Sequence, residues 1–153
     1  MAVVTRQRVV GTAPDDLWRV ISDPEHLVRW WPRVVRVENV QGPAARKRTR
    51  WTTVLAAEGG RQVRADYRCT ASVTSSRYCW EQELGDGPFA KHFASVATQI
   101  ELTPEPSGTR VTITVGARMR GMARLGGGLF IARSTRSQLD EALSSLADIT
   151  KRP

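Results

Sequence analysis

His92 is the side chain of this sequence whose type best suits a general base, because the other histidine, His26, lies in a predicted exposed helical turn. The alternation around it places His92 on the same strand face as Val96 and Thr98. Phe89, just after the preceding turn, favours the opposite phase and a bulge. No carboxylate partner for His92 is evident along the chain, and a lone histidine is more often structural. His92 is the catalytic candidate, with proton transfer as its chemistry.

Other reactive groups are scarce. The spacing of Cys69 and Cys79 fits no zinc or thioredoxin-type motif. The signatures of serine hydrolases, zinc proteases, P-loop proteins and kinases do not occur. Asp66 is the most interior acid of its predicted strand, but the alternation turns it outward. We therefore expect no metal, no cofactor and no paired catalytic carboxylates.

Two consecutive predicted strands, 61–73 and 76–84, carry most of the side chains suited to contact a ligand. A two-residue Ser-Ser loop between them predicts four opposed pairs: Val73 with Tyr78, Ala71 with Trp80, Cys69 with Gln82, and Tyr67 with Leu84. The inward face then carries Tyr67, Tyr78, Trp80 and Gln82. Cys69 would point inward and Cys79 outward, so we expect no disulfide between them.

Periodicity and turn residues predict the elements that position these side chains. Residues 3–10 alternate as a strand, a helix begins at Pro14, and a second short helix runs from Glu25 to Trp30 or Trp31 before Pro32. Six further strands are predicted at 33–41, 46–57, 61–73, 76–84, 90–103 and 109–119. In the last hairpin, Ile100 is expected opposite Ile113, and Leu102 opposite Val111. A long helix follows, with an apolar stripe of Leu125, Leu129, Ala132, Leu139, Leu143 and Leu146.

Length and composition predict one soluble globular domain over 1–153, with 41% apolar and 25% charged residues. No stretch is apolar enough to span a membrane, and the first residues lack the apolar core of a secretory signal, so we expect a cytoplasmic protein. The sequence leaves a homodimer open.

The net charge of +8 raises the question of an anionic partner. Arg46, Arg48 and Arg50 would share one face of a predicted strand. Nucleic acid binding needs interleaved aromatic residues, and the nearest, Trp51, would lie on the other face. A solvated arginine face is therefore favoured, and nucleic acid is not an expected partner.

The order of elements resembles the helix-grip fold of the START-like superfamily, also called SRPBCC, over essentially the whole chain. The segments that carry the resemblance are APDDLWRVISDPEHL (13–27), WWP (30–32), YCWE (78–81), IELTP (100–104) and GTRV (108–111). Within the superfamily, the chain looks like the polyketide cyclase/dehydrase group and its lipid-transport relatives. The resemblance implies an α+β fold, with a curved antiparallel sheet of about seven strands wrapped on a long C-terminal helix and two short helices after the first strand.

The resemblance also implies a cavity for a hydrophobic small molecule between the sheet and the long helix. It places a pocket entrance at the end of the second short helix. From the residues themselves, Gly121 and Gly126 to Gly128 with Met119 and Met122 form either a movable gate or a simple connection where the last strand meets the long helix. The resulting candidates for ligand contact are Trp30, Trp31, Tyr67, Tyr78, Trp80, Gln82, Thr98, Met119, Met122 and Leu129.

Three functions remain as hypotheses. The first is binding of a lipid-like or polyketide-like molecule in the cavity. The second is a cyclase or dehydratase, in which His92 moves a proton and Tyr78 or Gln82 polarises a carbonyl. The third is a basic protein that docks on nucleic acid or an acidic partner through the run from Arg46 to Arg50.

Overall fold

The computed structural model describes residues 2–85, 93–120 and 123–150. In chain order, the elements are β1 (Ala2–Val10), α1 (Pro14–Ile21), η1 (Pro24–His26), α2 (Leu27–Trp30), β2 (Val34–Gln41), β3 (Arg50–Ala56), η2 (Glu58–Gly60), β4 (Gln62–Val73), β5 (Arg77–Glu83), β6 (Phe93–Glu105), β7 (Gly108–Met119) and α3 (Ala123–Thr150). The predicted order of strands and helices is confirmed. The main difference is β3, which begins at Arg50 rather than near residue 46.

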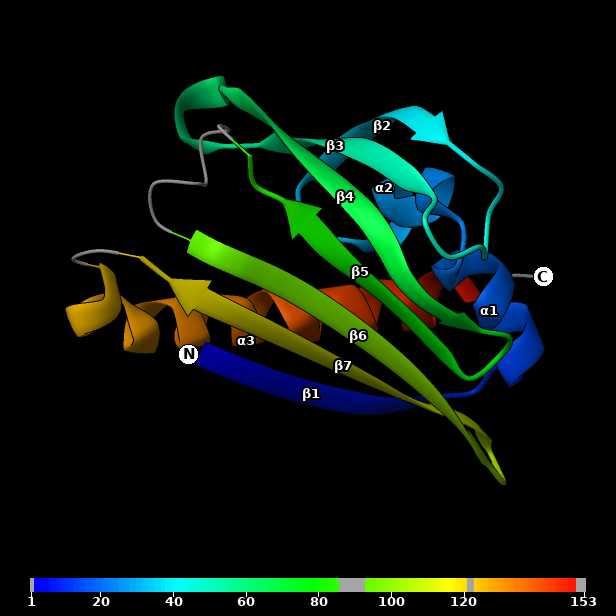
Figure 1. The fold of residues 1–153 in the computed structure, drawn as a ribbon. Coiled ribbons are helices and arrows are strands. Elements are labelled where there is room, and N and C mark those ends of the chain that lie inside the picture. The colour runs from blue at the N-terminus through cyan, green and yellow to red at the C-terminus, as the bar shows by residue number, and fades with distance from the viewer. Residues whose placement is uncertain (1, 86–92, 121–122, 151–153) are drawn as a thin grey trace.

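The seven strands form one antiparallel sheet in the order β1-β7-β6-β5-β4-β3-β2. The sheet curves around α3, while α1 and α2 lie at the end of the molecule where α3 finishes (Figure 1). This arrangement is the helix-grip fold of the START-like superfamily. Among the described residues, no helix is both long enough and apolar enough to cross a membrane.

Prolines and a capping side chain determine where the short helices α1, η1 and α2 begin or end. Pro14 occupies the first turn of α1, where a missing N–H costs nothing. Asp23 caps η1 by accepting a hydrogen bond from the backbone N–H of Glu25 at 3.0 Å. Trp31 follows α2 with extended backbone, because the next residue is Pro32 and a residue before proline avoids the helical region. The chain therefore leaves the helix at Trp31 and turns toward the sheet.

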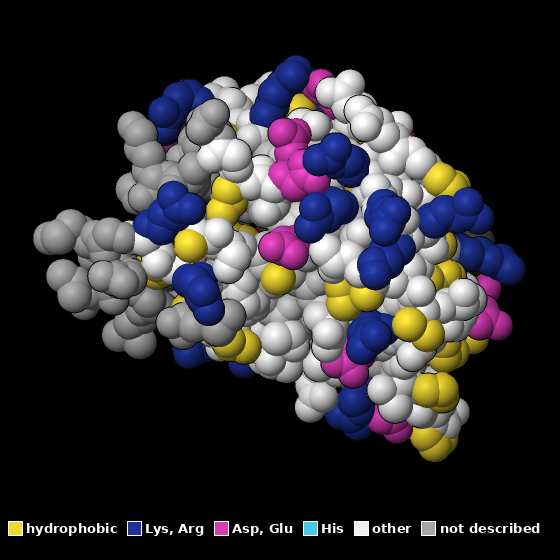
Figure 2. All heavy atoms as spheres, in the orientation of Figure 1, with side chains coloured by type: hydrophobic (Ala, Val, Ile, Leu, Met, Phe, Trp, Pro, Cys, Tyr) yellow, Lys and Arg dark blue, Asp and Glu magenta, His cyan; other side chains and the backbone are white. Residues whose placement is uncertain are grey.

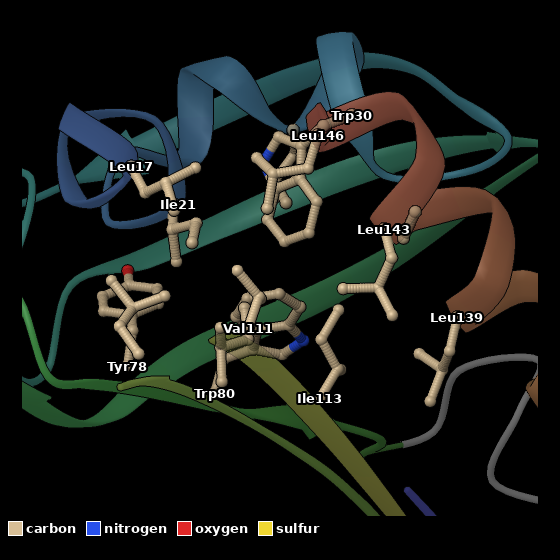
Figure 3. Packing of buried hydrophobic residues seen from close by; sticks show 14 of the residues in the cluster. Leu17, Ile21, Trp30, Tyr78, Trp80, Val111, Ile113, Leu139, Leu143 and Leu146 are labelled. Atoms are coloured by element: carbon tan, nitrogen blue, oxygen red, sulfur yellow. The ribbon is translucent and has the colours of Figure 1, made fainter. Parts of the chain in front are cut away.

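The core lies where α1, α2 and the second half of α3 meet the inner face of the sheet. Leu17 and Ile21 from α1 point toward Tyr78 of β5, and Leu143 and Leu146 of α3 point toward the same layer (Figure 3). These side chains are buried. The predicted stripe of the long helix is confirmed at Leu139, Leu143 and Leu146, whereas the side chains of Leu125 and Leu129 lie outside the described part.

The predicted register of the β4–β5 hairpin is wrong. Val73 pairs with Arg77, not with Tyr78, because the turn has three residues rather than two and places Ser75 at a positive φ of 58°. A second shift lies between Cys69 and Ala71, after which Cys69 pairs with Trp80. Both cysteines are free, as expected.

The β6–β7 hairpin has the predicted register, with Ile100 opposite Ile113 and Leu102 opposite Val111. A register shift between Phe93 and Ser95 interrupts the alternation at the start of β6. The bulge expected in this strand therefore exists, and it turns Phe93 to the inner face.

The basic run does not form a strand face. Arg46 and Arg48 lie in the exposed loop before β3, and only Arg50 belongs to the strand, where it makes an ion pair of 2.7 Å with Glu83. Similar pairs join Arg36 and Arg64 to Glu38, so acidic and basic side chains alternate on this face of the molecule (Figure 2). The predicted stripe is wrong because its first residues belong to a turn.

Candidate functional site

A cavity of about 490 Å³ lies between the inner face of the sheet and α3. This volume falls in the range of pockets that hold a small organic molecule. Its walls come from the segment after α2, the β3–β4 hairpin, strands β5, β6 and β7, and one face of α3. The curvature of the sheet creates this space, because α3 packs closely against the sheet only along part of its length.

Aromatic side chains form one wall of the cavity. Trp31 meets Trp80 edge to face, with ring centroids 5.1 Å apart, and both rings line the cavity. Tyr67 lines it too and stacks on Trp51, with centroids 6.0 Å apart. Each ring is held by another ring, so this wall is fixed in position before any ligand arrives.

Polar side chains line the same cavity from two sides. Gln82 of β5 and Thr98 of β6 contribute from the sheet, while Thr135 and Gln138 contribute from α3. None of these four side chains makes a side-chain hydrogen bond to another residue in the described part of the chain. Their donors and acceptors are therefore free to bind a polar group of a ligand.

The phenol of Tyr67 is a neutral donor. Burial raises its pKa to about 12, and hydrogen bonding with Thr53 offsets only part of this effect. A phenol with this pKa keeps its proton at neutral pH. Tyr67 can therefore donate a hydrogen bond to a ligand carbonyl, but it cannot serve as a base.

The two tyrosines of the chain are expected to resist ionisation while the protein is folded. Burial raises the pKa of Tyr78 far above its usual range and that of Tyr67 to about 12, whereas a tyrosine in the unfolded chain ionises near pH 10. The unfolded chain therefore loses protons first, and stability falls as the pH rises above about 10. Phenolate absorbance should appear together with the loss of circular dichroism. A phenolate titrating near pH 10 in the folded protein would contradict this expectation.

Five of the predicted ligand contacts meet at the cavity. The structure brings together Trp31, Tyr67, Trp80, Gln82 and Thr98 as lining residues. They come from four separate segments of the chain, and the alternation of the strands was enough to identify all but Trp31.

Three predicted contacts lie elsewhere in the described part of the chain. Trp30 and Tyr78 are each about 1% exposed and belong to the core at the α1–α2 end, and neither lines the cavity. Met119 is buried at the end of β7 and is likewise not among the lining residues. Of the two neighbouring tryptophans, Trp31 thus lines the cavity, and Trp30 packs against it edge to face with ring centroids 5.3 Å apart.

The remaining predictions fall outside the described residues. His92 and Met122 belong to the ranges that the structure leaves undescribed, and so does the side chain of Leu129. Catalysis by His92 and a gate at Met119 and Met122 therefore stay predictions. Among the described residues, no cluster of histidine, cysteine, aspartate or glutamate could hold a metal ion.

Several lining residues were missed from the sequence. Phe93 lines the cavity because the bulge between it and Ser95 changes the phase of β6. Val96 has the inward facing that the alternation predicts, but it is not among the predicted ligand contacts. Gln138 precedes the buried Leu139 on α3, and a polar residue beside an apolar stripe is a weak signal. Arg33, Glu58 and Arg61 belong to turns, where strand alternation gives no information.

A curved antiparallel sheet that wraps a long C-terminal helix, with a cavity between the two, defines a START-like helix-grip protein. The sequence profile for polyketide cyclase/dehydrase and lipid transport proteins matches residues 1–149. The chain therefore belongs to this family, which includes polyketide cyclases.

Solved structures share the fold at low sequence identity. A START superfamily protein from Mycobacterium smegmatis has a TM-score of 0.78 and 12% identity, with 99% of each chain covered. The protein TTHA0849 from Thermus thermophilus has a TM-score of 0.74 and 23% identity, over 95% of this chain and 94% of that one.

The di-domain ARO/CYC StfQ of the steffimycin biosynthetic pathway also matches, with a TM-score of 0.78 and 14% identity. The match covers 98% of this chain but 52% of StfQ, so this chain spans about half of that protein. Comparison with curated proteins gave no match. These similarities establish the fold, and function must be argued from the cavity.

Proposed function

We propose that this protein binds a hydrophobic small molecule, lipid-like or polyketide-like, in the cavity between the sheet and α3. The observation that carries the proposal is a space of about 490 Å³ lined by an aromatic wall and by polar side chains that bond to no other described side chain. Family membership supports the same class of ligand.

Apolar burial would supply most of the binding free energy. Each 100 Å² or so of ligand surface buried against these walls contributes about 2.5 kcal/mol, whereas one hydrogen bond contributes about 1 kcal/mol. Trp31, Leu55 and Val96 line the cavity, are only partly buried and offer such surface. Gln82, Thr98 and Gln138 would then fix the orientation of the ligand by bonding to its carbonyl or hydroxyl groups.

Native mass spectrometry of the freshly purified protein, followed by denaturing extraction, tests the proposal. We expect either an adduct of one apolar molecule per chain or, for an empty protein, a complex of that stoichiometry after incubation with fatty acids, quinones or aromatic polyketides. Failure of every member of the panel to bind would contradict the proposal.

A second candidate function is cyclisation or dehydration of a poly-β-keto chain in the same cavity. One observation favours it: the neutral phenol of Tyr67 lies in the lining with the amide of Gln82, and both can polarise a carbonyl. The mass-spectrometric assay distinguishes the two functions. A bound molecule that is released with unchanged mass and unchanged structure supports carriage. A released product that has lost one water, or an isomer of unchanged mass that contains a new ring, supports the enzyme.

A further inference from the structure

The charged residues of the described lining lie at the opening of the cavity. Arg33, Glu58 and Arg61 are the charged members of the described lining, and all three are exposed, so they mark the end that faces solvent. The rest of the described lining, which includes Trp80 and the buried Leu139, is uncharged. Within the described lining, a ligand therefore meets charged side chains only at the opening.

Arg33 is held at this opening by an unusual backbone conformation. Its φ is 66°, in the left-handed region that costs a residue other than glycine about 1 kcal/mol or more. The carbonyl of Arg33 accepts a hydrogen bond of 2.8 Å from the N–H of Ala56, at the end of β3. This bond ties Arg33 to the β3–β4 hairpin, which carries the other two charged residues.

Arg61 is held by the turn of that hairpin. The N–H of Ala57 donates to the carbonyl of Arg61 at 2.8 Å, and Nε of Arg61 donates to the carbonyl of Glu58 at 3.3 Å. The terminal nitrogens of Arg61 have no hydrogen-bond partner within the described residues. They are therefore free to bind another acceptor.

The arginines at the opening differ from those on the outer face of the sheet. Arg36, Arg50 and Arg64 all form ion pairs of 3.0 Å or less with glutamates. Arg33 and Arg61 form no ion pair with any described residue, although the carboxylate of Glu58 belongs to the same lining. Because two arginines and one glutamate are the charged residues at the opening, their net charge is positive.

We propose that the ligand is amphipathic and that its anionic head group, a carboxylate or a phosphate, binds Arg33 and Arg61 at the opening while its apolar part fills the cavity. This inference rests on the proposed function and adds the chemical class and the direction of the ligand. The guanidinium groups suit this role because each can bind an oxyanion through two parallel N–H donors. Glu58 opposes the head group, so it limits the affinity.

Three ligands with the same alkyl chain test the proposal: dodecanoate, dodecanol and dodecyl phosphate. Their affinities are measured by calorimetry below the concentrations at which they aggregate. We expect dodecanoate to bind about tenfold more tightly than dodecanol, because its carboxylate adds one charge-assisted hydrogen-bonded pair at a solvent-exposed site. Tighter binding of dodecyl phosphate than of dodecanoate identifies a phosphate head group, and the reverse order identifies a carboxylate.

Variants assign the preference to the opening. Arg33→Gln and Arg61→Gln should each remove most of the preference for dodecanoate over dodecanol. Glu58→Gln should increase the preference. Arg46→Gln is the matched control, because it removes the same charge from an exposed loop outside the lining and should change nothing.

Two outcomes separate this inference from the function on which it rests. Equal affinity of the unmodified protein for dodecanoate, dodecyl phosphate and dodecanol would overturn the anionic head group and leave hydrophobic binding intact. Loss of the preference in Arg46→Gln, to the same extent as in Arg61→Gln, would show a general charge effect and would also overturn it. Absence of binding by all three ligands would contradict both proposals.

Discussion

Val96→Trp is expected to weaken ligand binding about a hundredfold while the protein remains folded. Val96 lines the cavity from β6 and is only partly buried, so an indole at this position enters the open space instead of the packed core. The indole displaces roughly 100 Å² of ligand contact, which is worth about 2.5 kcal/mol or nearly two factors of ten in affinity. Calorimetric titration with the tightest ligand of the mass-spectrometric panel measures the loss.

Ala97→Trp is the matched control for this substitution. Ala97 is the next residue of the same strand, pairs with Gly116 across the sheet, and is exposed on the opposite face. The same indole there should leave the affinity unchanged. Equal binding by Val96→Trp and the unmodified protein, with unchanged circular dichroism, would show that the ligand occupies a different site.

The sequence was sufficient for the fold because its elements carry local signals. Pro14 and Pro32 mark the two ends of the short-helix region. In the last hairpin, the apolar alternation of 100–102 and 111–113 predicts which residues pair across the two strands and which face of the sheet they occupy. The register of the β4–β5 hairpin depends instead on the positive φ of Ser75. The sequence does not predict this conformation, because serine rarely adopts a positive φ.

The cavity lining was predictable where it follows strand alternation and unpredictable elsewhere. The side chains of Tyr67, Trp80 and Gln82 point inward as predicted, although the predicted register is wrong. The longer turn and the shift between Cys69 and Ala71 each move the pairing by one residue. Together they move it by two residues, so the same face of β4 points into the cavity. Arg33 and Arg61 enter the lining through turns. Their contribution requires the turn after α2 to contact the end of β3 through the bond between Arg33 and Ala56, and no periodicity encodes this contact.

The positions of the arginines in the structure change the interpretation of the net positive charge of the chain. The run from Arg46 to Arg50 dominates the sequence, yet Arg50 is neutralised by Glu83 and the preceding residues lie in a loop away from the cavity. Arg33 and Arg61 are isolated in the sequence and lie together at the opening. Net charge alone locates no site for an anion, and our proposal of Arg33 and Arg61 rests on their positions in the fold.

Gly108→Ala is expected to be the most destabilising substitution in the β6–β7 turn, with a loss of about 3 kcal/mol or more. Gly108 has a φ of 146°, and an added Cβ would lie 2.1 Å from the carbonyl oxygen of Val10 and 2.9 Å from the backbone nitrogen of Thr12. Both contacts are with backbone, so β1 and the connection to α1 would have to move. Equilibrium denaturation in urea measures the loss.

Gly59→Ala is the control, because it also has a positive φ, of 71°, but an added Cβ would meet nothing within 4 Å. It should cost about 1 kcal/mol from backbone strain alone. The difference between the two variants therefore isolates the contact between the β6–β7 turn and the end of β1, which the buried Thr109 reinforces by donating to the carbonyl of Thr12 at 2.6 Å. If Gly108→Ala accumulates only as insoluble protein while Gly59→Ala stays soluble, the order of the two effects is the same. Equal stability of the two variants would show that the end of β1 yields without cost, and the close packing of this turn would then not be required for the fold.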